Sequence, residues 1–331
     1  MITHPPFTRA LLFSLILFPG ISGRAEVNQV QKLTPTVYFH EGDIKGKGHC
    51  NNGWVIFEDY VLVIDANFPS GAQEILPKIK ALTDKPVRFV FDTHHHGDHA
   101  YANQFWVENG AIPVAHAGVL DEMKKYEPGR WNETMKGRPD VAATKLKIPT
   151  VFYRNEMFFD DGAERAEFRY FGVAHTHGDG FVWLPKEKIL FTGDACVNGA
   201  YNYAADGDTA QWIETLEAAK KLGAKIVCPG HGPMGTAELL EDQQQFFIEL
   251  RSEVKKISGR SPAEAKASVP EIKSALEKHD RIKKFVGNSL AAQVEKVYVE
   301  MGGQPFSKSA AVDEHHLHLV AHGGEVAGKG R

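Results

Sequence analysis

The sequence predicts an α/β (mixed α+β) fold followed by a run of C-terminal helices. Short apolar runs of strand length alternate with amphipathic segments of helical period, a pattern typical of α/β proteins. One apolar run, residues 87–91, ends directly at a cluster of histidines. Folds of this class place their chemistry on loops at the carboxyl ends of strands, so this point of the chain is the first candidate site.

The predicted strands are short, and Gly or Asn lies at the turns between the first of them. In the first part of the chain they cover residues 37–39, 54–57, 61–65 and 87–91. A helix is predicted at residues 72–82, although Pro77 is unfavourable inside a helix. Further strands are predicted at residues 151–153, 168–171, 181–184, 189–191 and 225–227, with a helix at 209–222.

Residues 236–305 are predicted to form a helical extension. Thr236 is expected to cap a long amphipathic helix that ends near Gly259. The sequence Ser261-Pro262-Ala263-Glu264 is a capping box with proline at the first helical position, and a last helix is predicted at residues 290–301. The tail, residues 306–331, is rich in Gly and Ala; we expect it to be disordered, with loose metal binding by its histidines as the alternative.

Residues 1–25 have the features of a secretory signal peptide. Arg9 precedes a mostly apolar stretch too short to span a bilayer, and Gly23 and Ala25 suit cleavage before Glu26. An uncleaved anchor or a buried helix is the alternative. We therefore expect a periplasmic or secreted protein with no stable membrane span after cleavage.

Composition excludes some partners. The net charge is −4 and the chain has no long basic run, which argues against nucleic acid as a ligand. The three cysteines, Cys50, Cys196 and Cys228, do not have the spacing of a cysteine-based zinc site, and we expect them to be small buried residues. The sequence does not predict their pairing or the oligomeric state.

The histidine cluster is the strongest functional signal. Within six residues the chain carries His94, His96, Asp98 and His99, and imidazole and carboxylate are ligands that Zn²⁺ prefers. A solvated His-rich loop is the alternative. In an extended loop His94 and His96 face one side, so His95 should face the other.

Three further loops present ligand types among small residues. They are Gly172-Val173-Ala174-His175-Thr176-His177-Gly178-Asp179, Phe191-Thr192-Gly193-Asp194 and Cys228-Pro229-Gly230-His231-Gly232-Pro233. Small residues permit sharp turns and close backbone approach. The spacing alone does not decide between His175 and His177.

With these four segments in order, residues 33–235 resemble the metallo-β-lactamase superfamily. The resemblance implies an αββα sandwich, which we expect to fill residues 26–235, and a site for two Zn²⁺ ions. It assigns His94, His96 and His175 to the first metal, since the family places its ligand before the threonine. It assigns Asp98, His99 and His231 to the second metal and Asp194 to a bridge between them. His94, His96 and His175 are the first ligand group, and Asp98, His99 and His231 are the second ligand group.

The resemblance also implies a reaction. A metal-bridged hydroxide would attack an ester, thioester, lactone, β-lactam or related small-molecule substrate, with Asp98 as the catalytic residue that orients it and takes its proton. A bridging aspartate is typical of glyoxalase II-like hydrolases, whereas true zinc β-lactamases generally lack it. Iron-dependent oxidoreductases, such as sulfur dioxygenases, share the scaffold and are the alternative. A non-catalytic binding module is a third possibility.

Other residues are weaker candidates. The segment 126–138, rich in Gly, Pro and polar residues, is expected to be either a lid or a solvent-facing connection. Asp65 ends a strand and should either hydrogen-bond a ligand histidine or cap a turn. The candidate substrate contacts are His177, Tyr201, Tyr203, Arg130 and Trp131.

Overall fold

The computed structural model describes residues 26–306. The predicted signal peptide and, apart from Phe306, the predicted tail with its histidines lie outside the described residues. Of the described part, no helix is both long and apolar enough to cross a membrane.

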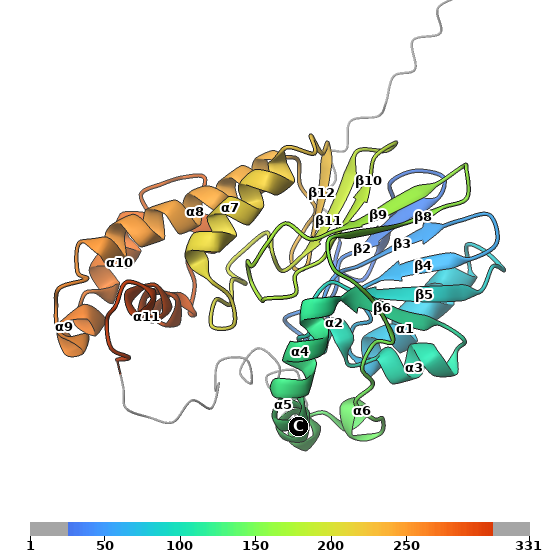
Figure 1. Ribbon diagram of the computed structural model, residues 1–331, viewed down its shortest axis with the longest axis horizontal. Coiled ribbons are helices and arrows are strands. Elements are labelled where there is room, and N and C mark those ends of the chain that lie inside the picture. Colours follow the sequence, from blue (N-terminus) through green and yellow to red (C-terminus); the bar gives the residue numbers. More distant parts are fainter. Residues whose placement is uncertain (1–25, 307–331) are drawn as a thin grey trace, which may run out of the picture.

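Two β-sheets lie together on the right of Figure 1, and the C-terminal helices lie on the left. The larger sheet has the order β1 (Val30–Lys32), β2 (Val37–His40), β3 (Asn52–Ile56), β4 (Val61–Ile64), β5 (Val87–Asp92), β6 (Ile112–His116) and β7 (Val151–Tyr153). The smaller has the order β12 (Ile226–Pro229), β11 (Ile189–Gly193), β10 (Phe181–Leu184), β9 (Arg165–Arg169) and β8 (Glu156–Asp160). Strands β4 to β7 pair in parallel, and so do β11 and β12, so their carboxyl ends share sheet edges.

Alternation along the strands builds three apolar layers. In β4, Leu62 and Ile64 belong to the core between the sheets, whereas Val61 and Val63 pack with helices α1 (Pro69–Lys80) and α3 (Asn103–Glu108). In β10, Val182 and Leu184 face the same central core, and Trp183 packs with α7 (Thr209–Lys220) and α8 (Glu238–Lys255). Because successive side chains of a strand face opposite sides, the central strands of each sheet bury side chains on both faces. The αββα prediction is confirmed.

The remaining helices follow α8. They are α9 (Pro262–Ala267), α10 (Val269–Leu276), the short 3₁₀ helix Lys283–Phe285 and α11 (Leu290–Glu300). Figure 1 shows α9, α10 and α11 gathered at the end of α8 that lies away from the sheets. The capping box is present, because the Ser261 hydroxyl accepts from the Glu264 amide and the Glu264 carboxylate accepts from the Ser261 amide. Thr236 is not the N-cap, since α8 begins at Glu238.

Several elements differ from the sequence prediction. Helix α1 begins at Pro69 rather than at residue 72, with proline at a favoured first-turn position. Strands β1, β6 and β8 were not predicted, and β6 contains Pro113. The segment 126–138 forms a helix, α5 (Glu127–Gly137), between α4 (Ala117–Lys125) and α6 (Pro139–Ala142), and Asn132, Glu133 and Lys136 on it are exposed. All three cysteines are buried free thiols.

Two buried histidines give the fold a pH dependence. Burial, followed by the charge of Lys78, lowers the pKa of His40 to about 4, and burial with the charge of Arg138 does the same for His49. In the unfolded chain each histidine protonates near pH 6.5, so the unfolded state binds more protons between pH 6.5 and 4. Their stability contribution is therefore complete above pH 6.5 and is lost as the pH falls through this window.

We expect the substitution His40→Gln to reduce the loss of folding stability at acidic pH. Urea unfolding of chelator-treated protein would give the free energy of unfolding at pH 7 and at pH 5. Between these two values the free energy should fall by about 2 kcal/mol less in the variant than in wild type, since each pKa unit is worth about 1.36 kcal/mol. The exposed His279 gives a control, and His279→Gln should leave the drop unchanged. An identical drop in His40→Gln and wild type would contradict the pKa assignment.

Candidate metal centre

The four predicted ligand segments meet at one side of the sandwich. The first follows β5 and enters the short helix α2 (Gly97–Ala100); the second joins β9 to β10; the others follow β11 and β12. In the smaller sheet β10 runs antiparallel to β11, so its amino end lies beside the carboxyl ends of β11 and β12. All seven predicted ligands are buried: His94, His96, Asp98, His99, His175, Asp194 and His231.

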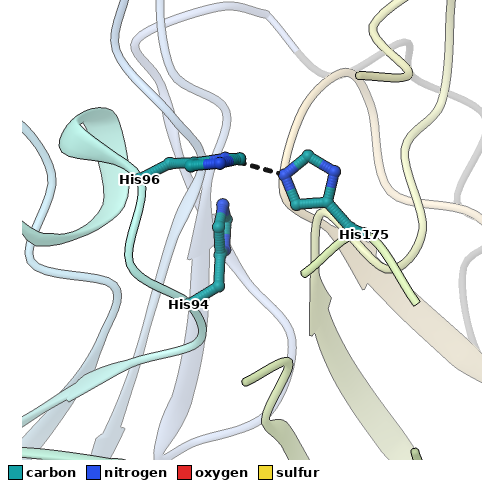
Figure 2. Close-up of side chains that lie close together, drawn as sticks. All are labelled: His94, His96 and His175. Atoms are coloured by element: carbon teal, nitrogen blue, oxygen red, sulfur yellow. Dashed lines mark hydrogen bonds between the residues drawn. The ribbon is translucent and has the colours of Figure 1, made fainter. Parts of the chain in front are cut away.

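The first ligand group brings three imidazoles together. One nitrogen from each of His94, His96 and His175 lies within 4.8 Å of the others. Figure 2 shows the three rings converging, with Nδ1 of His96 2.8 Å from Nε2 of His175. The Nε2 atom of His94 is buried and has no hydrogen-bond partner among the described residues. A buried nitrogen without a partner is costly, and a metal ion here would satisfy it.

The protonation of this group suits metal binding. Burial lowers the pKa of His175 to about 4. Burial, with the neighbouring His99, also holds the pKa of His94 well below its usual range. Neutral imidazole is the form that ligates metals, so these two side chains are ready to bind at neutral pH.

The second ligand group is equally compact. Ligand atoms of Asp98, His99 and His231 lie within 4.8 Å of one another. The Nε2 atom of His231 is 3.1 Å from Oδ2 of Asp98 and 3.3 Å from Nε2 of His99. A carboxylate and two imidazoles form a donor set that zinc accepts.

Asp194 lies between the two groups. Its Oδ1 is 3.3 Å from Nε2 of His99, and its Oδ2 is 3.3 Å from Nε2 of His231 and 3.7 Å from Nε2 of His175. The backbone of Gly230 passes so close that a Cβ there would lie 2.0 Å from Oδ1 of Asp194. Glycine is therefore required at position 230 if the carboxylate is to keep this position.

The second nitrogen of three ligand rings is held by another group. Nδ1 of His99 lies 2.9 Å from Oδ2 of Asp65, and the other oxygen of Asp65 accepts from Thr93. The interpretation that Asp65 hydrogen-bonds one of the predicted ligand histidines is therefore confirmed. Nδ1 of His175 lies 2.7 Å from the Tyr203 carbonyl oxygen, and Nε2 of His96 lies 2.7 Å from Oδ2 of Asp206. Such contacts fix the ring orientation, and in a metal site the inward nitrogen would then be the ligand atom.

Asp206 belongs to a buried charge network that the sequence did not reveal. Arg130 donates to both its oxygens, at 2.7 and 3.0 Å. His95 lies between Asp206 and Glu122, and its ring is 4.5 Å from the His96 ring. Burial alone would raise the pKa of Asp206, but His95, His96 and Arg130 hold it well below its usual range. Asp206 is therefore an ionised partner for His96.

The candidate substrate contacts occupy different environments. The Tyr201 ring is 5.9 Å from the His231 ring, and the Tyr203 ring is 5.5 Å from the His96 ring. His177 is exposed. Trp131 is buried and packs on Tyr101, with ring centroids 4.6 Å apart, so in this structure it anchors α5. Arg130 donates hydrogen bonds to the Asp206 carboxylate.

We expect Asp206→Ala to weaken metal binding about 10- to 100-fold, the usual effect of losing a group that orients a ligand histidine. Zinc titration of the apo-protein against a chelator would measure it. Asp208 is the control, because its carboxylate caps α7 through the Ala210 and Gln211 amides. Asp208→Ala should cost about 1 kcal/mol of stability and leave zinc affinity unchanged. Equal zinc affinity in Asp206→Ala and wild type would contradict the role of Asp206.

The chain is similar to several proteins of known type. The chain is 24% identical over 233 residues to the metallo-beta-lactamase IND-1 of Chryseobacterium indologenes, covering 67% of this chain and 90% of that protein. It is 26% identical over 154 residues to a hydroxyacylglutathione hydrolase of Acaryochloris marina, covering 46% of this chain and 53% of that protein. A solved metallo-beta-lactamase from Pontibacter korlensis superposes with a TM-score of 0.57 at 22% identity, covering 66% of this chain and 98% of its own.

The family model described as the metallo-beta-lactamase superfamily matches residues 46–231, which include all seven predicted ligands. The matched region is more than half of the chain, and members of this family are metal-dependent hydrolases. The chain therefore belongs to the metallo-beta-lactamase superfamily and is an enzyme of that hydrolase class.

Proposed function

We propose that this protein is an exported hydrolase that binds two zinc ions and acts on a small ester, thioester, lactone or related substrate. The observation that carries the proposal is the position of Asp194 between two complete ligand groups, with its oxygens within 4 Å of imidazole nitrogens from both. One tetrahedral zinc needs only four ligands, whereas seven converge here. When bound, a metal pair supplies a nucleophilic hydroxide near neutral pH and polarises the bond under attack.

Asp98 is the proposed catalytic residue. Burial alone would raise its pKa, but His99 and His231 lower the pKa to about 2, so the carboxylate is ionised at neutral pH. It lies at the second ligand group with one oxygen 3.1 Å from Nε2 of His231. An ionised carboxylate at this position can orient the attacking group and accept its proton.

The proposed substrate class rests on Asp194. The residue type suits a carboxylate bridge, which is typical of glyoxalase II-like hydrolases, and the Acaryochloris marina relative is named as a hydrolase of hydroxyacylglutathione. We therefore favour oxygen esters, thioesters and lactones over β-lactams. Tyr201, beside His231, and the exposed His177 are the side chains proposed to contact substrate.

The test combines metal analysis with a substrate panel. Protein purified without added metal should contain two zinc ions per chain, and it should hydrolyse an ester, thioester or lactone faster than a β-lactam. Fewer than two ions in active, zinc-saturated protein would overturn the two-metal proposal. Iron as the native metal, with oxygen consumed on a persulfide substrate, would establish the oxidoreductase alternative. Fractionation of the producing cells would test export, and cytoplasmic full-length protein would contradict it.

A further inference from the structure

We infer that the C-terminal helices position the first ligand group: α8 and α11 fix Asn202, and the loop that begins there orients His175 and His96. This inference rests on the proposed function, because it concerns the residues that would hold a metal. It assigns to Gln243 and Gln293, outside the part of the chain that the family model matches, a role in the metal centre.

The loop after β11 has no regular secondary structure in the stretch that contacts His175. Residues 201–204 lie in neither a strand nor a helix, so no backbone ladder fixes them. Nevertheless this stretch supplies the Tyr203 carbonyl oxygen that lies 2.7 Å from Nδ1 of His175. A little further on, Asp206 lies 2.7 Å from Nε2 of His96. The orientation of two of the three rings in the first group therefore depends on how this loop is held.

Three side chains of the extension hold it. Gln243 of α8 donates to the side-chain oxygen of Asn202, and Gln293 of α11 donates to the backbone oxygen of Asn202 at 2.6 Å. Lys296 of α11 donates to the Ala205 carbonyl oxygen at 3.2 Å. Gln243 and Gln293 are 0% and 1% exposed, and hydrogen bonds that are buried to this degree are costly to leave unmade.

The second ligand group is held differently. Its His99 is oriented by Asp65, which follows β4 and is itself fixed by Thr93 at the end of β5. That support comes from the larger sheet and makes no use of α8 or α11. Loosening the helical contacts to Asn202 should therefore weaken the first group and spare the second.

The experiment removes the amide donors. Gln293→Met and Gln243→Met keep side-chain length and burial but lose the hydrogen bond to Asn202. Zinc titration of each apo-protein against a chelator is expected to show one binding constant weakened about 10-fold or more, with the other unchanged. If Gln293→Met does not fold, Lys296→Met, at a more accessible position, removes the bond to Ala205 and should produce a smaller shift in the same constant.

Gln244 provides the matched control. It neighbours Gln243 on α8, is 9% exposed, and donates to the Ile213 carbonyl oxygen of α7 at 3.0 Å. Gln244→Met should lower the urea midpoint as much as Gln243→Met does but leave both zinc constants unchanged. Equal weakening of zinc binding in the control would show a general effect of destabilisation and overturn the inference.

A double-mutant cycle identifies the site. Because His94→Ala already disables the first ligand group, adding Gln293→Met should cause no further loss of zinc affinity. A full additive loss, or unchanged constants in Gln293→Met alone, would refute the positioning role. Wild-type protein that binds only one zinc would instead refute the two-metal function, and the cycle would then be judged on that single constant.

Discussion

Replacing Asp194 with alanine is expected to weaken zinc binding at both sites and to lower kcat/KM by roughly 10³-fold or more, as for loss of a central electrostatic group. Its oxygens approach His99, His231 and His175, so one substitution removes a ligand from each group. It also removes the negative charge between two cations, which raises their mutual repulsion. Calorimetric titration of the apo-variant with zinc, beside hydrolysis rates, would measure both effects.

The pattern of loss decides the role of Asp194. Two tight zinc sites in the alanine variant would refute a ligand role, and loss of one site with the other unchanged would show a terminal ligand rather than a bridge. Asp160, on β8, pairs with Arg165 in a partly exposed ion pair. Asp160→Ala therefore serves as the control and should keep both sites and full activity.

Asp98→Asn is expected to lower kcat about 10²- to 10⁴-fold, the range attributed to a positioned proton acceptor. The amide has nearly the same size but cannot accept a proton in the same way, and it is a poorer metal ligand. The first ligand group does not include Asp98, so one zinc should still bind with wild-type affinity. Stopped-flow hydrolysis with parallel metal analysis would test this. A variant with normal kcat would show that Asp98 is at most a ligand.

The sequence predicted which segments carry the candidate ligands, but it did not predict which residues hydrogen-bond those ligands. His94 to His99 are recognisable because several ligand types crowd into a few residues. Asp206 and Asp208 look alike in the sequence, and both follow a stretch without periodicity. Only the fold shows that Asp206 reaches His96 while Asp208 caps α7.

The contact of Arg130 with Asp206 was not predicted for a related reason. Gly129 and Gly137 made residues 126–138 look like a loop, yet the segment is helical, with Pro128 in the first turn of α5. Burial of Trp131 against Tyr101 is a tertiary contact that overrides weak local propensity. The resulting helix directs Arg130 to Asp206, an outcome that no local pattern could indicate.

The ligands come from both sheets: His94 to His99 follow a strand of the larger one, whereas His175, Asp194 and His231 follow strands of the smaller one. Zinc bound here would link the two halves of the sandwich and would add about 2.7 kcal/mol of stability at a free concentration 100 times its dissociation constant. Zinc starvation would then do more than silence the enzyme. It would increase the population of opened molecules, which proteases degrade, so the supply of metal would set how much enzyme survives as well as how fast each molecule works.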